Sequence, residues 1–197
     1  MTHTFDEAYW EAHWGSAEGG GMPPHPALDT ELSSLTPGTA LDAGSGEGAE
    51  ALWLATRDWE VTAVDISAEA LRRAASRAPT DVRSVRWIEA DLTRWEPETT
   101  YDLVTTFYAH PTIPQVEFYR RISRWVTPGG ALFIVGHAHG APHGGHGHHP
   151  AQATASPESV RAMLDDTEWD LRTAETRTRH ARGMTLNDIV IRAHRLP

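Results

Sequence analysis

The stretch LDAGSGEGAEA, residues 41–51, joins a short apolar run to a run of helix formers through a loop with three glycines. Gly44, Gly46 and Gly48 permit a tight turn, and they let a ligand approach the backbone without a clash with Cβ atoms. A helix that begins after such a loop presents free backbone N–H groups at its first turn. The stretch therefore predicts a strand, a ligand-binding loop and a helix, in that order.

The segments on either side alternate between strand-like and helix-like apolar patterns. Ser67 and Ser156 have the residue type and position of helix N-caps. We expect a turn at TPGG, and the last two strand-like runs predict an antiparallel hairpin at the sheet edge. The expected strands are 39–43, 61–65, 85–91, 101–107, 131–136, 170–180 and 185–194; the expected helices are 47–58, 67–78, 114–126 and 156–166; the turn is 127–130.

This order of elements predicts the α/β fold class. The expected architecture is a Rossmann-like, doubly wound sheet of seven strands, mostly parallel, with a C-terminal antiparallel hairpin and helices on both faces. A length of 197 residues fits a single domain over residues 1–197. Within it we expect an N-terminal helical cap (1–34), a cofactor-binding core (35–136), a histidine-rich loop (137–155) and a C-terminal helix and hairpin (156–197).

The amino-acid composition limits which kinds of binding partner are expected. The formal net charge is −10, all 17 basic residues are arginines, and there is no cysteine. Nucleic-acid binders usually carry a basic patch, so nucleic acid is not an expected partner. No run reaches the roughly 18 apolar residues of a membrane helix, and the N-terminus lacks the pattern of a secretory signal. We expect a cytoplasmic monomer or homodimer that acts on a small molecule.

Three acids stand at successive strand ends, which is where ligands bind in this architecture. They are Asp42, Asp65 and Asp91. The glycine loop alone also fits a dinucleotide, because Gly44, Gly46 and Ala49 satisfy G-x-G-x-x-A. However, a carboxylate beside a pyrophosphate costs on the order of 1–4 kcal/mol, whereas the ammonium and sulfonium of S-adenosylmethionine attract carboxylates. The simpler interpretation is that each acid only caps the turn that follows it.

Five segments resemble the motifs of the class I S-adenosylmethionine-dependent methyltransferases: LDAGSGEG, VDIS, ADL, YDLVTTFYAH and WVTPGGALFIV. The resemblance covers roughly residues 35–197. It implies S-adenosylmethionine as the cofactor and in-line methyl transfer to a small-molecule acceptor. The expected cofactor-binding residues are Asp42, Gly44, Ser45, Gly46, Gly48, Asp65, Ile66, Asp91, Leu92 and Thr106. The opening YWEAHW…HPAL is similar to the tellurite-resistance and thiopurine methyltransferase groups, in which an aromatic N-terminal segment covers the cofactor and the acceptor.

The acceptor side is expected at the N-terminal segment, the end of the fourth strand and the loop after the fifth. Candidate catalytic residues are Tyr108, His110 and His137, because a histidine near neutral pH can accept a proton. Candidate substrate contacts are Tyr9, Trp14, His25 and His139. Alternatively, Phe5, Tyr9 and Trp10 form the apolar stripe of a core helix, and His110 caps the turn before Pro111.

The stretch GHAHGAPHGGHGHHP, residues 136–150, holds six of the 12 histidines. It fits a mobile active-site lid, a metal site or a solvated loop. His137 and His139 are the candidates for binding zinc, nickel or copper; no metal is expected as a resident cofactor. A metal-binding or metal-sensing protein is thus an alternative function, and a nicotinamide oxidoreductase is a further one, which Asp42 disfavours.

Overall fold

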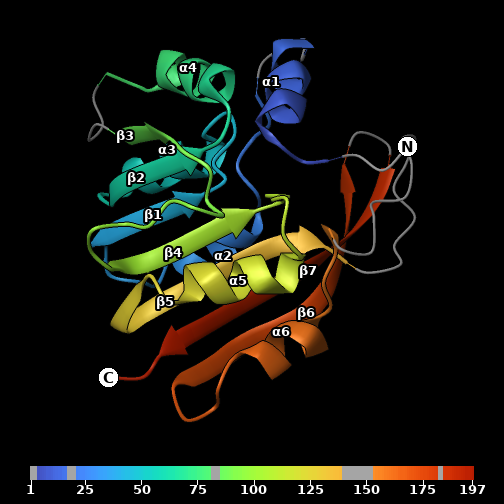
Figure 1. Ribbon diagram of the computed structural model, residues 1–197. Coiled ribbons are helices and arrows are strands. Elements are labelled where there is room, and N and C mark those ends of the chain that lie inside the picture. Colours follow the sequence, from blue (N-terminus) through green and yellow to red (C-terminus); the bar gives the residue numbers. More distant parts are fainter. Residues whose placement is uncertain (1–3, 17–20, 81–84, 139–152, 182–183) are drawn as a thin grey trace.

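The computed structural model describes residues 4–16, 21–80, 85–138, 153–181 and 184–197. Its sheet has the strand order β3-β2-β1-β4-β5-β7-β6 (Figure 1). The first five strands run parallel to one another, and β7 is antiparallel to both β5 and β6. The predicted seven-stranded, mostly parallel sheet with its C-terminal hairpin is confirmed. The strands are β1 Thr39–Ala43, β2 Glu60–Asp65, β3 Arg86–Glu89, β4 Tyr101–Phe107, β5 Val126–His137, β6 Trp169–Ala181 and β7 Met184–Arg195.

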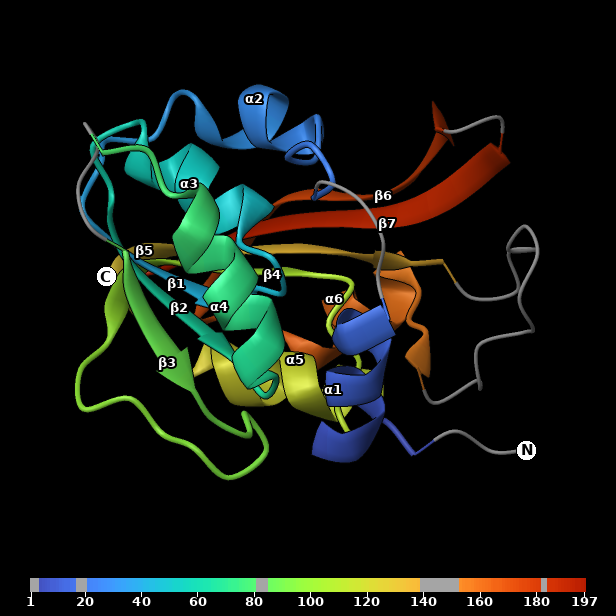
Figure 2. The ribbon, with the colours of Figure 1, turned by 90° about the horizontal axis from the view of Figure 1, so that it is seen from above.

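Helices cover both faces of the sheet, as predicted. Figure 2 shows α2, α3 and α4 on one side of the strands and α5 and α6 on the other. Ser67 caps α4 by accepting from the Ala70 N–H, and Ser156 forms a capping box with Ser159, so both predicted N-caps are confirmed. The helices are α1 Glu7–Ser16, α2 Ala27–Leu32, α3 Ala49–Ala55, α4 Ala68–Arg77, α5 Gln115–Ser123 and α6 Pro157–Met163. None of the described helices has the length and apolar character needed to cross a bilayer.

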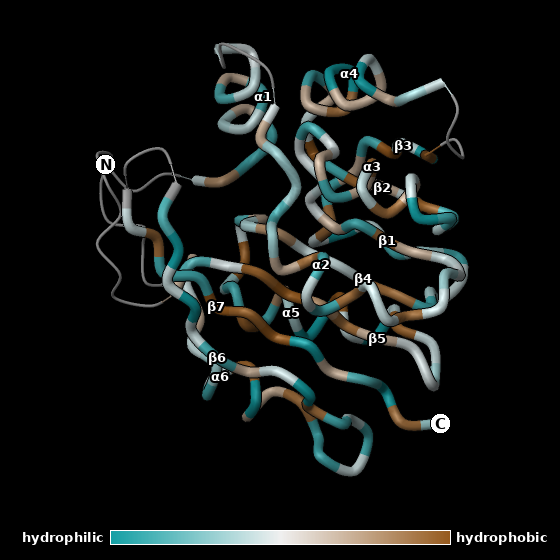
Figure 3. Tube along the Cα trace, turned by 180° about the vertical axis from the view of Figure 1, so that it is seen from behind, coloured by the Kyte–Doolittle hydropathy of each residue, from teal (hydrophilic) through white to brown (hydrophobic). Residues whose placement is uncertain are grey.

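Two apolar cores lie on opposite faces of the sheet, because successive residues of a strand point to opposite sides. On β4, Leu103 packs into the core beneath α2 and α3, and Val104 packs into the core beneath α5 and α6. Figure 3 shows hydrophobic stretches running through the strands. Each fully buried Leu, Ile or Phe contributes about 1.5–3 kcal/mol, so the sheet is a rigid support for the loops at its ends.

Two local predictions need correction. The expected turn at 127–130 lies inside β5, which runs continuously over Val126–His137. Its start pairs with Tyr101 and the register then shifts before Leu103, so the extra residues form an irregularity within the strand rather than a turn between elements. The third strand is shorter than expected and ends at Glu89, so Asp91 lies in the turn that follows it.

The helix α1 stands at the carboxyl ends of the parallel strands, beside α4 (Figure 1). It has no buried residue, so the interpretation of Phe5, Tyr9 and Trp10 as the stripe of a core helix is wrong. Glu11 holds the helix in place: its Oε1 accepts from the Ser67 Oγ at 2.8 Å and from the Glu69 N–H at 3.1 Å. An acid at the first turn of α4 is stabilised by the free N–H groups there.

Candidate active site

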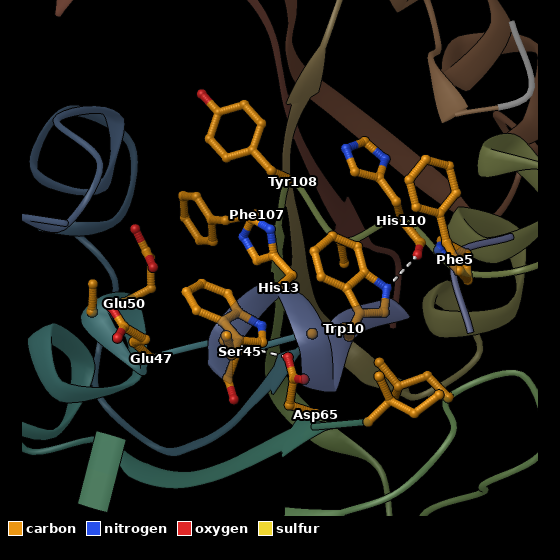
Figure 4. A pocket seen from close by; sticks show the side chains of 18 of the residues that line it. Phe5, Trp10, His13, Ser45, Glu47, Glu50, Asp65, Phe107, Tyr108 and His110 are labelled. Carbon is orange, nitrogen blue, oxygen red and sulfur yellow. Dashed lines mark hydrogen bonds between the residues drawn. The ribbon is translucent and has the colours of Figure 1, made fainter. Parts of the chain in front are cut away.

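A cavity of about 680 Å³ opens at the carboxyl ends of the parallel strands, between the glycine loop and α1 (Figure 4). Thirteen of the sequence-predicted site residues line it. They are Gly44, Ser45, Gly46, Asp65, Ile66, Asp91 and Leu92 of the cofactor set; Tyr9, Trp14 and His25 of the substrate set; and Tyr108, His110 and His137 of the catalytic set. The structure thus brings residues from both halves of the chain to one cavity.

The glycine loop requires glycine at the positions where the chain turns. Gly44 has φ +79° and Gly46 has φ +50°. A Cβ on Gly44 would lie 2.3 Å from the Cβ of Ala109, and one on Gly46 would lie 3.1 Å from the Trp14 ring. The loop is therefore closed in by β4 on one side and by α1 on the other, and its backbone faces the cavity.

Two of the strand-end acids line the cavity while also bonding to their own turns. Asp65 accepts from the Gly46 N–H at 2.7 Å and from the Ser67 N–H at 3.0 Å. Asp91 accepts from the backbone N–H and the hydroxyl of Thr93. Both acids therefore bond within their own turns. A carboxylate has about four acceptor sites, so each acid can also accept from a ligand. Burial raises the pKa of Asp65.

Asp42, Gly48 and Thr106 do not belong to the described cavity lining, and their role as cofactor contacts stays a prediction. Asp42 lies inside β1, 1% exposed, and accepts from the Thr105 hydroxyl across the sheet at 3.0 Å. Burial first, and then the nearby charge of Glu50, raises the pKa of Asp42 to about 8. Asp42 is thus mostly protonated at neutral pH, and it adds little charge to the loop. The Thr106 hydroxyl donates to the Ala43 carbonyl, and Gly48 packs against Trp87.

Two glutamates in and after the loop have different environments. Glu47 binds Arg77 at 2.8 Å and Arg73 at 3.3 Å. Burial raises the pKa of Glu47, but the hydrogen bonds from both arginines outweigh it and hold that pKa below its usual range. Glu50, which the sequence analysis missed, lines the cavity and accepts from the His25 N–H at 3.0 Å. Burial raises its pKa, since no arginine compensates it among the described contacts.

The predicted acceptor side contains a group of neighbouring aromatic and imidazole rings. The His110 and His137 rings lie 5.3 Å apart at 14°, and Tyr108 lies 4.7 Å from His137. Tyr108 has φ +52°, a conformation that is uncommon outside glycine and that clusters at functional sites. The Trp10 indole N–H donates to the His110 carbonyl at 3.3 Å, which ties α1 to this turn (Figure 4).

A polar network from the C-terminal hairpin supports the same rings, and sequence reasoning missed it. The buried Asp188 of β7 accepts from the Arg179 Nε at 2.5 Å and lies 3.3 Å from the His25 Nε2. The other end of the Arg179 guanidinium donates to the Tyr108 hydroxyl at 3.0 Å. Burial raises the pKa of Asp188, but hydrogen bonds from His25, Tyr108 and Arg179 outweigh it, so that pKa is low. The carboxylate is therefore charged, and its Oδ2 is the atom that His25 and Arg179 contact.

The metal interpretation has no support within the described part of the chain. No group of three histidine, aspartate or glutamate side chains there has the arrangement of a metal site. His137 contacts Tyr108 and His110, which are not a metal-ligand set. His139 and the rest of the histidine-rich loop up to residue 152 lie outside the described residues.

A doubly wound sheet with a glycine loop after β1 and acids after β2 and β3 defines the class of α/β proteins that bind a nucleoside-bearing cofactor. Residues 40–130 match the family model described as a methyltransferase domain. An uncharacterized methyltransferase of Mycobacterium tuberculosis is 39% identical over 118 residues, which are 54% of this chain and 56% of that protein. A probable thiol methyltransferase of Arabidopsis thaliana is 29% identical over 138 residues, which are 64% of this chain and 60% of that protein. The matches thus span little more than half the length of these relatives.

Among solved structures, the N-methyltransferase NodS of Bradyrhizobium japonicum in complex with S-adenosyl-L-homocysteine has a TM-score of 0.71. The sequence identity is 16%, and the superposition covers 99% of this chain and 100% of that chain, so the likeness shows the fold. Together with the matches above, which include the methyltransferase domain over residues 40–130, it supports a class I S-adenosylmethionine-dependent methyltransferase. S-adenosylmethionine is the methyl donor of this family, which decides between the two ligands that the glycine loop left open.

Proposed function

We propose that the protein transfers a methyl group from S-adenosylmethionine to a small, uncharged acceptor with a hydroxyl or thiol group on a planar ring. The observation that carries this proposal is the cavity itself. One end is formed by the glycine loop and Asp65, and the other by the rings of Tyr108, His110 and His137. S-adenosylmethionine supplies, when bound, an electrophilic methyl group on a positively charged sulfur.

The residues at the first end fit that donor. Gly44 and Gly46 line the cavity, and Asp65 and Asp91 offer acceptors for hydroxyl and amino groups. Glu50 adds a half-buried carboxylate to the cavity wall, beside Glu47 (Figure 4). A positively charged ligand is favoured there, because it offsets the cost of burying these carboxylates.

Charge also limits the acceptor. Arg179 is the only arginine among the described lining residues, and Asp188 already neutralises it. An acceptor with a carboxylate or phosphate would meet Glu50, Asp65 and Asp91 without a free cation to bind. Repulsion between like charges a few ångströms apart costs on the order of 1–4 kcal/mol each, so an uncharged acceptor is favoured.

The walls and His110 indicate the acceptor's shape and chemistry. Phe5, Trp10, Phe107 and Tyr108 present aromatic surfaces that suit a flat ring. In-line displacement needs the attacking atom held about 3 Å from the methyl carbon. A hydroxyl or thiol must also lose its proton, and we assign its acceptance to His110, which lines the cavity. A thiol acceptor also agrees with the similarity to the Arabidopsis relative, a probable thiol methyltransferase.

Four one-ring acceptors test the proposal: phenol, thiophenol, aniline and benzoate. Each is incubated with the protein and S-adenosylmethionine, and the methylated products are measured by mass spectrometry. We expect phenol or thiophenol to be methylated and benzoate to be the poorest acceptor. Exclusive methylation of aniline or benzoate would contradict the acceptor class, and no turnover with any ring compound would contradict the proposed site.

The donor site is tested separately by calorimetry with S-adenosylhomocysteine. Replacing Asp65 by Ala removes charged hydrogen bonds worth about 1.5–3 kcal/mol, which corresponds to a loss of affinity of about 10- to 150-fold. Asp102→Asn, at the opposite end of β4, is the matched control and should bind as the wild type does. Equal affinity of the Asp65→Ala variant and the wild type would refute the donor site.

A further inference from the structure

Gln115 is a buried polar side chain beside the proposed catalytic histidine. It is the first residue of α5, it follows Pro114, and it is 3% exposed. A buried amide must satisfy both its donor and its acceptor, because each unpaired group costs about 1–3 kcal/mol. The partners of this amide therefore indicate what it does.

The contacts fix which way the amide points. The Gln115 Nε2 donates to the Ala109 carbonyl at 2.9 Å, and a carbonyl can only accept. The same amide hydrogen-bonds the hydroxyl of Tyr119, one helical turn further along α5. The amide nitrogen is thus committed, so the atom that lies 3.3 Å from the His110 Nδ1 is the oxygen, Oε1.

This arrangement determines the tautomer of His110. Since Oε1 is an acceptor, the Nδ1 must carry the hydrogen, and a neutral imidazole with Nδ1–H has its lone pair on Nε2. His25 shows the opposite state within the same cavity. Its Nδ1 accepts from the Ala27 N–H at 3.2 Å, so its Nε2 carries the hydrogen and donates to Asp188.

The ring and the backbone of His110 are also held. The Trp10 and His137 rings lie nearly parallel to the His110 ring, at 13° and 14°. Trp10 binds the His110 carbonyl and Gln115 binds the Ala109 carbonyl, so both peptides of the turn after Tyr108 are anchored. The stacking fixes the plane of the ring, and Gln115 fixes which nitrogen is the base.

We propose that Gln115 is a positioning residue that holds His110 as the Nδ1–H tautomer, so that its Nε2 can accept the proton of the methyl acceptor. The role of Nε2 as the base rests on the proposed function. The hydrogen-bonded state of His110 can be measured without any acceptor. In the transfer itself, the acceptor oxygen or sulfur bonds the methyl carbon, the carbon–sulfur bond of the donor breaks, and the acceptor proton moves to Nε2.

The experiment is a long-range ¹H–¹⁵N correlation spectrum of the ¹⁵N-histidine-labelled protein with S-adenosylhomocysteine bound, at a pH where imidazoles are neutral. The His110→Asn variant identifies the His110 signals by their loss. In the wild type we expect Nδ1 to give a pyrrole-type shift and Nε2 a pyridine-type shift. Gln115→Met, similar in size but unable to accept from Nδ1–H, should give a mixture of the two tautomers.

Two further variants separate positioning from packing. Gln115→Glu keeps an acceptor for Nδ1–H and should keep the wild-type tautomer. Ser123→Ala, which removes one hydrogen bond at the far end of the same helix, should leave the spectrum and the activity unchanged. With phenol as the acceptor, Gln115→Met should lower kcat about 10- to 100-fold, which is part of the roughly 10²- to 10⁴-fold that a positioned general base contributes. Its KM for S-adenosylmethionine should stay the same, and Gln115→Glu should recover part of kcat.

An Nε2–H tautomer of His110 in the wild type would overturn the proposal, even if Gln115→Met does not fold. A Gln115→Met protein with the wild-type tautomer and kcat would overturn it as well. If the ring acceptors are not methylated but the Nδ1–H tautomer is present and depends on Gln115, the proposed acceptor class fails and the hydrogen-bonded state of His110 stands.

Discussion

Replacing Asp42 by Asn should remove a large part of the pH dependence of stability. Asp42 is enclosed in β1, and burial together with the charge of Glu50 raises its pKa from 3.8 to about 8. Asn has the same shape, remains uncharged at every pH, and can still accept from the Thr105 hydroxyl through its Oδ1. The substitution therefore deletes the titration with little change in packing.

The sign follows from the two pKa values. Between about pH 4 and pH 8 the unfolded chain has released a proton that the folded protein retains. The contribution of Asp42 to the free energy of unfolding is thus fully present below pH 4, and it is lost as the pH rises through 8. One pKa unit corresponds to ~1.36 kcal/mol, so the change from pH 5 to pH 8 is on the order of 4 kcal/mol.

Urea titrations followed by tryptophan fluorescence at pH 5 and pH 8 measure this effect. We expect the wild type to lose stability over this interval and Asp42→Asn to lose on the order of 3–4 kcal/mol less. Some decline should remain, because burial also raises the pKa values of Glu50 and Asp65. Asp29→Asn, at an exposed acid, should shift both titrations equally. Parallel losses in the wild type and Asp42→Asn would refute the buried-acid argument.

Three further predictions concern the donor site and the hairpin. Binding of S-adenosylmethionine near pH 7 should release protons, because a cation lowers pKa values that burial has raised, including that of Glu50. Calorimetry in buffers of different ionisation enthalpy measures the number of protons released. Binding of S-adenosylhomocysteine, which lacks the sulfonium charge, should release fewer protons. Glu11→Gln keeps a hydrogen-bond acceptor but loses the negative charge at the start of α4, which weakens the attachment of α1 beside the cavity. The binding free energy of S-adenosylhomocysteine should therefore fall by about 0.3–1 kcal/mol. An unchanged affinity would show that other contacts hold α1. Arg179→Met should destabilise the protein by about 3–5 kcal/mol, because Asp188 is left charged and buried. Adding Asp188→Asn should recover much of this loss of stability in urea titrations. Additive losses in the double variant would contradict the coupling between Arg179 and Asp188.

Local patterns predicted the fold and the donor end of the cavity. The glycine loop, Asp65 and Asp91 all follow strands, and the carboxyl ends of parallel strands meet at one edge of a sheet. Their convergence follows once the order of strands and helices is known. Asp42 shows the limit of that reasoning. It lies one residue before the end of β1, so its side chain enters the interior of the sheet instead of the loop.

The acceptor end depends on contacts between distant segments that no local pattern specifies. Asp188 lies opposite His137 in the pairing of β5 with β7, and Arg179 comes from β6 across the hairpin. A slip of one residue in either pairing would turn these side chains to the other face of the sheet. Gln115 was equally hidden, because a glutamine at the start of a helix is ordinarily solvated, and its partners at the end of β4 belong to the preceding turn.

His25 and His110 have opposite tautomers, and each belongs to a different polar network: His25 to that of the C-terminal hairpin, and His110 to that of α5. At His25 both ring nitrogens are committed, one to the Ala27 N–H and one to Asp188. At His110 the Gln115 oxygen favours a hydrogen on Nδ1 in the neutral ring and in the protonated ring alike, so a proton can be added at Nε2 without loss of that bond. In the proposed reaction, the hairpin network therefore holds the wall of the acceptor side, and the α5 network leaves the His110 imidazole as the group that accepts the proton.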